Sequence, residues 1–128
     1  MNHYYDRSNL NRIPELMKLS PQAAAAFLTF EKEIYHSSEV LPLKTKELIA
    51  IAVAHVTGCP YCIDVHVKRY VDMGGTREEI FEAVLVAAST RAGAVLSHAT
   101  HALLAMEDTK LPPLTGKEQP PASPDCFC

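Results

Sequence analysis

Two cysteines, Cys59 and Cys62, stand three residues apart in the string Gly-Cys-Pro-Tyr-Cys-Ile-Asp-Val-His. The thiolate is the reactive form of cysteine, and the free N–H groups and dipole of a helix N-terminus stabilise it. Because Pro60 suits the first helical position, we expect Cys59 at the N-cap and Cys62 in the first turn. At this spacing the sulfurs are close enough for a disulfide across one turn. The pair therefore predicts thiol–disulfide chemistry.

His66 follows Cys62 by four residues, so both side chains project from one face of the same predicted helix. An imidazole in that position can accept the thiol proton directly or through a water molecule. Glu47 lies on the preceding predicted helix and could orient or charge His66 if the turn at Thr57-Gly58 folds the two helices together. These residues provide a nucleophile, a base and an orienting group.

The position of Glu47 raises a geometric difficulty. It lies about 11–12 residues before the turn, which is roughly 16–18 Å along a straight helix. In a plain antiparallel hairpin it would lie beside residues near Val71, so contact with the thiol site would require a bend, a steep crossing or a neighbouring subunit. We still predict that Glu47 is at least partly buried and within direct or one-water reach of His66 or the cysteines, because a buried carboxylate needs partners.

Other residues near the cysteine pair have alternative interpretations. Tyr61, between the cysteines, could pack or could tune the thiol as a hydroxyl donor. His55, four residues before Cys59, suits a core histidine or a cation at a helix C-terminus. The cysteine pair could also be half of a zinc site, completed by His66 or by the C-terminal cysteines Cys126 and Cys128.

The elements that carry these residues are predicted to be helices, about five to six in number, and the fold class is all-α. The residue patterns predict a short helix near 13–19, then helices over about 21–37, 42–57, 60–73 and 76–106, the last with a kink or break allowed at Gly93. We assign residues 20–106 to one helical domain, residues 1–19 to an N-terminal segment, and residues 107–128 to a proline-rich tail that is extended or disordered.

Composition narrows the functional classes. Of the 128 residues, 48% are apolar and 21% charged, and the net charge of −3 gives no basic footprint for nucleic acid or an anionic membrane. The first ten residues lack the pattern of a secretory signal. The longest apolar run, 48–56, is interrupted by His55 and is too short to span a membrane. We therefore expect a cytoplasmic protein, in which a Cys-x-x-Cys pair is more often catalytic or metal-binding than structural. The nearly all-round apolar character of the 42–57 and 76–106 helices also predicts burial, partly between subunits.

The strings KTKELIAIAVAHVTGCPYCIDVHV and EEIFEAVLVAASTRAGAVLSHATHAL resemble the carboxymuconolactone decarboxylase / alkylhydroperoxidase D-like family over about residues 20–106. The redox branch of that family has a Glu, a Cys-x-x-Cys pair twelve residues later, and a His four residues after the second Cys. The resemblance implies that Cys62 attacks, that Cys59 resolves, and that Glu47 and His66 relay the proton. It also implies a homo-oligomer, either a trimer or a hexamer.

Some peroxidases of the family have a His between the cysteines, where this chain has Tyr61, and His55 is a candidate to replace it. The decarboxylase branch works without the cysteine pair. We therefore predict a thiol-dependent peroxidase or disulfide oxidoreductase that needs no metal or organic cofactor, acts on a peroxide, and is regenerated by an external thiol reductant. The alternatives are a thiol protein that binds a soft metal or metalloid, and a carboxymuconolactone decarboxylase-like enzyme with vestigial thiols.

Overall fold

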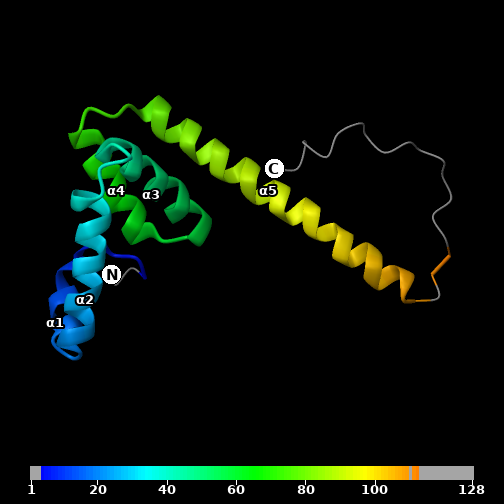
Figure 1. Cartoon of the computed structure of the whole chain (residues 1–128), viewed down its shortest axis with the longest axis horizontal. Helices are drawn as coiled ribbons and strands as arrows, with labels where there is room; N and C mark the ends of the chain where they lie inside the picture. Colours follow the sequence, from blue (N-terminus) through cyan, green and yellow to red (C-terminus); the bar gives the residue numbers. More distant parts are fainter. Residues whose placement is uncertain (1–3, 110, 113–128) are drawn as a thin grey trace. The chain divides into compact units, whose positions relative to one another are not determined.

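The computed structural model describes residues 4–109 and 111–112, so Cys126 and Cys128 lie outside the described residues. The chain divides into two compact units, Met1–Val84 and Leu85–Cys128. The described residues contain helices and no strand, which confirms the all-α class (Figure 1). In chain order the helical segments are η1 (Arg7–Arg12), α1 (Ile13–Met17), α2 (Pro21–Lys32), η2 (Glu33–Ser37), α3 (Leu43–Thr57), α4 (Pro60–Asp72) and α5 (Arg77–Glu107).

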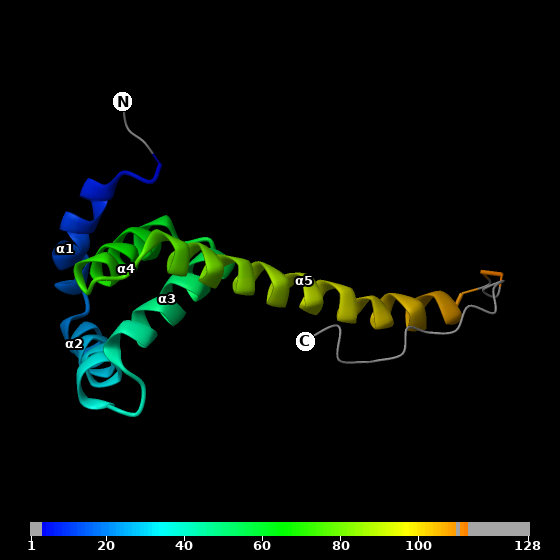
Figure 2. The same ribbon diagram turned by 90° about the horizontal axis from the view of Figure 1, so that it is seen from above.

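Helices α3 and α4 form the helical hairpin that carries the thiol pair, and they lie next to one another in both views (Figures 1 and 2). The α3 helix ends at Gly58, whose φ of 68° is the left-handed conformation that glycine adopts without steric cost. The next residue, Cys59, donates its N–H to the carbonyl of Ala54 at 3.0 Å and caps α4. The predicted stop at Gly58 and start at Pro60 are both confirmed.

The buried side chains of the first unit are few, and three of them share one stripe of α3. Glu47, Ile51 and Ala54 are spaced by four and three residues, so they lie on one face, and all three are buried together with Tyr70 of α4. On the other faces of α3, Val53 is 54% exposed. Burial of the apolar 42–57 helix is therefore limited to this stripe within one chain, and much of the remaining apolar surface is uncovered.

The connection from α4 to α5 is fixed by Tyr70. Its hydroxyl donates to the carboxylate of Glu79, and a Cβ placed on Gly75 would overlap the Tyr70 ring. The hydroxyl of Thr76 accepts the Glu79 N–H at 3.2 Å and so caps the first turn of α5. The Glu79 carboxylate accepts from the hydroxyls of Tyr70 and Thr76, so its side chain faces the end of α4.

The helix predicted over 21–37 is present over that range, but its first part is an α-helix and its last turn is a π-helix. It begins as an α-helix at Pro21, and Ser20 occupies the N-cap position without making a side-chain hydrogen bond. After Lys32 it continues as the π-helical segment η2, closed by a hydrogen bond from the Ser38 N–H to the carbonyl of Glu33. Such π-turns occur often at functional sites.

Helix α5 is uninterrupted from Arg77 to Glu107, so Gly93 does not divide it. Many of its large apolar side chains are exposed, and Ala87, at 8% exposure, is its only buried residue in the described part. By length and composition alone α5 is also apolar enough to cross a membrane, and one such helix is weak evidence for a membrane location. The sequence estimate overlooked this helix because it counted uninterrupted apolar runs, whereas polar residues are dispersed along α5.

Candidate active site around the thiol pair

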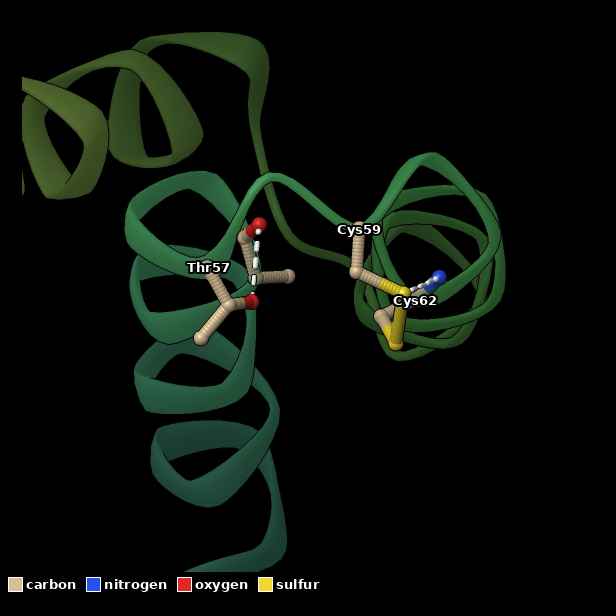
Figure 3. The surroundings of a disulfide bond; sticks show 4 residues. Thr57, Cys59 and Cys62 are labelled. Carbon is tan, nitrogen blue, oxygen red and sulfur yellow. Dashed lines mark hydrogen bonds between the residues drawn. A yellow bond between two sulfur atoms is a disulfide. The ribbon is translucent and has the colours of Figure 1, made fainter. Parts of the chain in front are cut away.

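Cys59 and Cys62 form a disulfide at the start of α4, with Cα atoms 5.3 Å apart (Figure 3). The Cys59 sulfur also accepts a hydrogen bond of 3.2 Å from the Cys62 N–H, so it is both the N-cap of the helix and one end of the disulfide. Both cysteines are half-buried. The structure thus confirms that the spacing brings the two sulfurs together at a helix N-terminus, where a released thiolate is stabilised.

The carboxylate of Glu47 contacts His66 directly. The Oε2 atom of Glu47 lies 2.5 Å from Nδ1 of His66, and the side chains are 3% and 15% exposed. The other carboxylate oxygen, Oε1, lies 3.7 Å from Nη1 of Arg69, a side chain that is 49% exposed. Glu47 is therefore a buried acid held between an imidazole and a guanidinium. Its burial and its contact with His66 agree with the prediction from the sequence, whereas the contact with Arg69 was not predicted.

The hairpin estimate placed Glu47 opposite Val71, whereas its partners are His66 and Arg69, the latter lying two residues before Val71 on α4. Arg69 is close to the expected register, and His66 is about one turn nearer to the thiols on the same face. The carboxylate spans this turn by using one oxygen for each partner. The contact is made inside one chain and does not need a neighbouring subunit.

Cys62 and His66 open onto the same hollow surface. Both line a cavity of about 510 Å³ between η2, α3 and α4, and both line a second cavity of about 520 Å³ beside α2. The first cavity is mainly apolar, with Leu41, Ile49 and Val53 in its wall. Cys59 lines neither cavity. A small apolar molecule in either space would therefore meet Cys62 before Cys59.

Tyr61 is turned toward the N-terminal segment. Its hydroxyl accepts a hydrogen bond of 2.9 Å from the amide of Asn9 and donates to the carbonyl of Tyr4 at 3.3 Å. Arg7 makes a bidentate ion pair with Asp64 at 2.8 and 3.0 Å, on the first turns of the same helix. These contacts favour a docking role for Tyr61 over the tuning of a thiol.

His55, the other accessory candidate, is exposed, and its Nδ1 contacts the carbonyl of Ile51 one turn earlier on α3 at 2.7 Å. It lines neither of the two cavities that Cys62 and His66 share. Because it is exposed, His55 is not a core histidine, and its place in the last turn of α3 matches the alternative of a histidine at a helix C-terminus.

Two residues near His66 were missed by the sequence analysis. Tyr35 stacks on His66 with ring centroids 5.9 Å apart and an interplanar angle of 22°. Burial, and then the nearby Glu47 carboxylate, raises the pKa of the Tyr35 hydroxyl above its ordinary value. Arg69 could have been found, because it follows His66 by three residues and so shares its face. Tyr35 gave no such signal.

Among the residues that the structure describes, no group of three or more His, Cys, Asp or Glu side chains is arranged to hold a metal ion. The zinc interpretation that used the cysteine pair with Cys126 and Cys128 depends on residues outside the described range.

Residues 21–105 match the carboxymuconolactone decarboxylase family. An uncharacterised protein of the cox locus of Paracoccus denitrificans is 48% identical over 83 residues, which are 65% of this chain and 74% of that protein. The alkyl hydroperoxide reductase AhpD of Corynebacterium kroppenstedtii is 44% identical over 43 residues, but the match spans only 34% of this chain and 25% of that protein.

The fold also resembles a solved structure. A protein from Methanobacterium thermoautotrophicum superposes with a TM-score of 0.65 at 28% sequence identity. The match covers 68% of this chain and 97% of the other.

Proposed function

The chain belongs to the carboxymuconolactone decarboxylase family, and we propose that within it the protein is a thiol-dependent peroxidase or disulfide oxidoreductase. One observation carries the proposal: a disulfide-forming pair at a helix N-terminus, whose second cysteine shares a cavity with a histidine that contacts a buried glutamate. The similarity to an alkyl hydroperoxide reductase over 43 residues supports a peroxide as the oxidant.

The oxidative half of the reaction begins at Cys62. In the reduced protein His66 accepts the Cys62 thiol proton, and the thiolate attacks the terminal oxygen of a hydroperoxide. An S–O bond forms and the O–O bond breaks, which leaves Cys62 as a sulfenic acid. The departing alkoxide takes the proton from His66 and leaves as an alcohol. Glu47 stabilises the imidazolium while it exists.

Cys59 closes the cycle. Its sulfur attacks the sulfenic sulfur of Cys62, the S–S bond forms, and the hydroxyl leaves as water with the Cys59 proton. Two equivalents of an external thiol then reduce the disulfide by exchange and are themselves oxidised to a disulfide. The same pair could exchange with a disulfide substrate in place of a peroxide, which is the oxidoreductase form of the proposal.

The family match alone does not separate the decarboxylase alternative from the redox one, but the candidate site is built around the cysteine pair, which favours thiol chemistry. A soft-metal site formed by Cys59, Cys62 and His66 would need both sulfurs as thiolates. Counting thiols with and without reductant, together with a metal assay of the purified protein, separates binding from redox chemistry. Bound metal that blocks thiol titration would favour the binding alternative.

We also propose that the protein is a cytoplasmic homo-oligomer, a trimer or a hexamer. Large apolar side chains are exposed on several helices of the single chain, among them Phe30 at 62%, Val86 at 65% and Leu104 at 58%. Exposed apolar surface of this extent is typical of protein–protein contacts. Sedimentation at micromolar concentration tests the proposal, and a monomer would contradict it.

The enzymatic proposal is tested by turnover. Purified protein is supplied with an organic hydroperoxide and dithiothreitol, and the loss of peroxide is followed in the wild type, in Cys62→Ser and in Cys59→Ser. We expect catalytic loss of peroxide in the wild type and no turnover above the uncatalysed rate in Cys62→Ser. Turnover in Cys62→Ser that equals the wild type would contradict the mechanism.

A further inference from the structure

Tyr35 occupies a position that the proposed reaction does not use. Its half-buried ring lies nearly parallel to the His66 imidazole, with centroids 5.9 Å apart. The other aromatic residues of the preceding helix, Phe27 and Phe30, are 58% and 62% exposed. Tyr35 also lines both of the cavities that contain Cys62 and His66. Phe27 and Phe30 line only the second of these cavities, so Tyr35 is the one of the three rings that lies in the wall of both.

The π-turn η2 aims this ring. Lengthening the helical turn by one residue rotates the side chains that follow relative to those of α2. The ammonium group of Lys46 donates to the carbonyls of Ile34 and Ser38, one on each side of Tyr35 in the chain. Lys46 immediately precedes Glu47, so one turn of α3 positions both neighbours of His66: the carboxylate at its Nδ1 and the ring on its face.

These two contacts constrain different motions of the imidazole. The Glu47 carboxylate at Nδ1 selects the tautomer that carries its proton there, which leaves Nε2 to exchange a proton with a thiol. A hydrogen bond at one atom still allows the ring to swing about it. The parallel Tyr35 ring restricts that swing, and an aromatic face within about 6 Å also favours the imidazolium form.

We propose that Tyr35 is a positioning residue, whose ring, aimed by the π-turn and Lys46, holds the His66 imidazole with Nδ1 on Glu47 and Nε2 directed to the Cys62 site. The required property is the aromatic face. Phenylalanine should therefore replace Tyr35, and leucine should not.

The structural part of the test does not depend on the proposed peroxidase function. Nitrogen-15 NMR of the oxidised protein reports the tautomer of each histidine, and the His66→Gln spectrum identifies the His66 signal. We expect the Nδ1-protonated tautomer to predominate in the wild type and in Tyr35→Phe, and the signal to move toward a tautomer average in Tyr35→Leu. A His66 signal in Tyr35→Leu identical to the wild type would overturn the proposal.

The kinetic part rests on the proposed function. The rate of disulfide formation after one addition of cumene hydroperoxide should fall about 2- to 10-fold in Tyr35→Leu, the effect of losing one aromatic pair, and be retained in Tyr35→Phe. Phe81→Leu removes an exposed ring outside the site and is the matched control. An equal loss of rate in Tyr35→Phe and Tyr35→Leu would also overturn the proposal, because it would assign the effect to the hydroxyl.

The proposal remains testable if Tyr35→Leu does not fold, and also if the wild-type thiols do not react with hydroperoxide. If Tyr35→Leu does not fold, Lys46→Met releases the π-turn and should produce the same shift in the His66 signal, and an unchanged signal would overturn the proposal. If wild-type thiols do not react with hydroperoxide, the peroxidase function fails, while the NMR comparison still decides whether Tyr35 positions His66.

Discussion

Replacing Glu47 with glutamine tests whether a buried charge assists the thiol chemistry. The change keeps the size of the side chain and an acceptor oxygen for His66, but removes the negative charge. Glu47 is 2% exposed as a residue, and its oxygen lies 2.5 Å from Nδ1 of His66, so solvent screens the contact weakly. Arg69, at 3.7 Å and 49% exposed, adds less.

The magnitude follows from the kind of hydrogen bond that is lost. A hydrogen bond to a charged group contributes about 1.5–3 kcal/mol, and a neutral one about 0.5–1.5 kcal/mol. Exchanging the first for the second costs about 1–2 kcal/mol at the step in which His66 is positive, or roughly a 5- to 30-fold loss of rate. The free energy of unfolding should change less, because removing a buried charge also removes its desolvation cost.

The assay is a single turnover of reduced protein with cumene hydroperoxide, followed by the loss of free thiols in stopped flow. Glu78→Gln, an exposed carboxylate in the first turn of α5, is the matched control and should react like the wild type. Circular dichroism verifies that both variants are folded. A folded Glu47→Gln protein that reacts as fast as Glu78→Gln would refute the assignment of Glu47 to the proton relay.

Limiting iodoacetamide added to reduced protein should label Cys62 in preference to Cys59, because Cys62 lines both cavities with His66, and peptide mapping that finds mainly Cys59 labelled would reverse their roles. Burial, and then the bond to Glu79, raises the pKa of Tyr70 from 10.0 to about 12, so its contribution to stability is complete below pH 10 and is lost as the pH rises toward 12. The urea midpoint should fall over that interval more steeply in the wild type than in Tyr70→Phe, and equal slopes would contradict the assignment. Gly75→Ala should destabilise the protein by about 1–3 kcal/mol, because the added Cβ overlaps the Tyr70 ring, and urea unfolding measures the loss.

Local signals in the sequence were sufficient for the α3–α4 hairpin. Gly58 and Pro60 each act within one turn of the chain, through the left-handed φ of one and the fixed φ of the other. The same locality placed Cys59 at the N-cap and brought the two sulfurs together. Because these features depend on neighbouring residues only, the packing of the rest of the chain does not alter them.

The contacts between helices were harder to predict from the sequence. The buried stripe that begins at Glu47 can be read from its spacing to Ile51 and Ala54, but a residue count alone put the carboxylate opposite Val71 and not His66. Tyr35 was beyond prediction because a regular helix would direct it elsewhere. Its direction depends on a π-turn whose carbonyls bind Lys46, a contact between residues 12 and 8 positions apart on different elements.

The central claim is that Cys62 is the sulfur that attacks a peroxide and that Cys59 resolves it. Mass spectrometry of the reduced Cys59→Ser protein after one equivalent of cumene hydroperoxide tests this claim most directly, with dimedone present to trap a sulfenic acid. The account predicts a dimedone adduct on Cys62 in Cys59→Ser and a markedly slower reaction of Cys59 in Cys62→Ser. An adduct that forms on Cys59 in Cys62→Ser, with Cys62 left as a free thiol in Cys59→Ser, would contradict it.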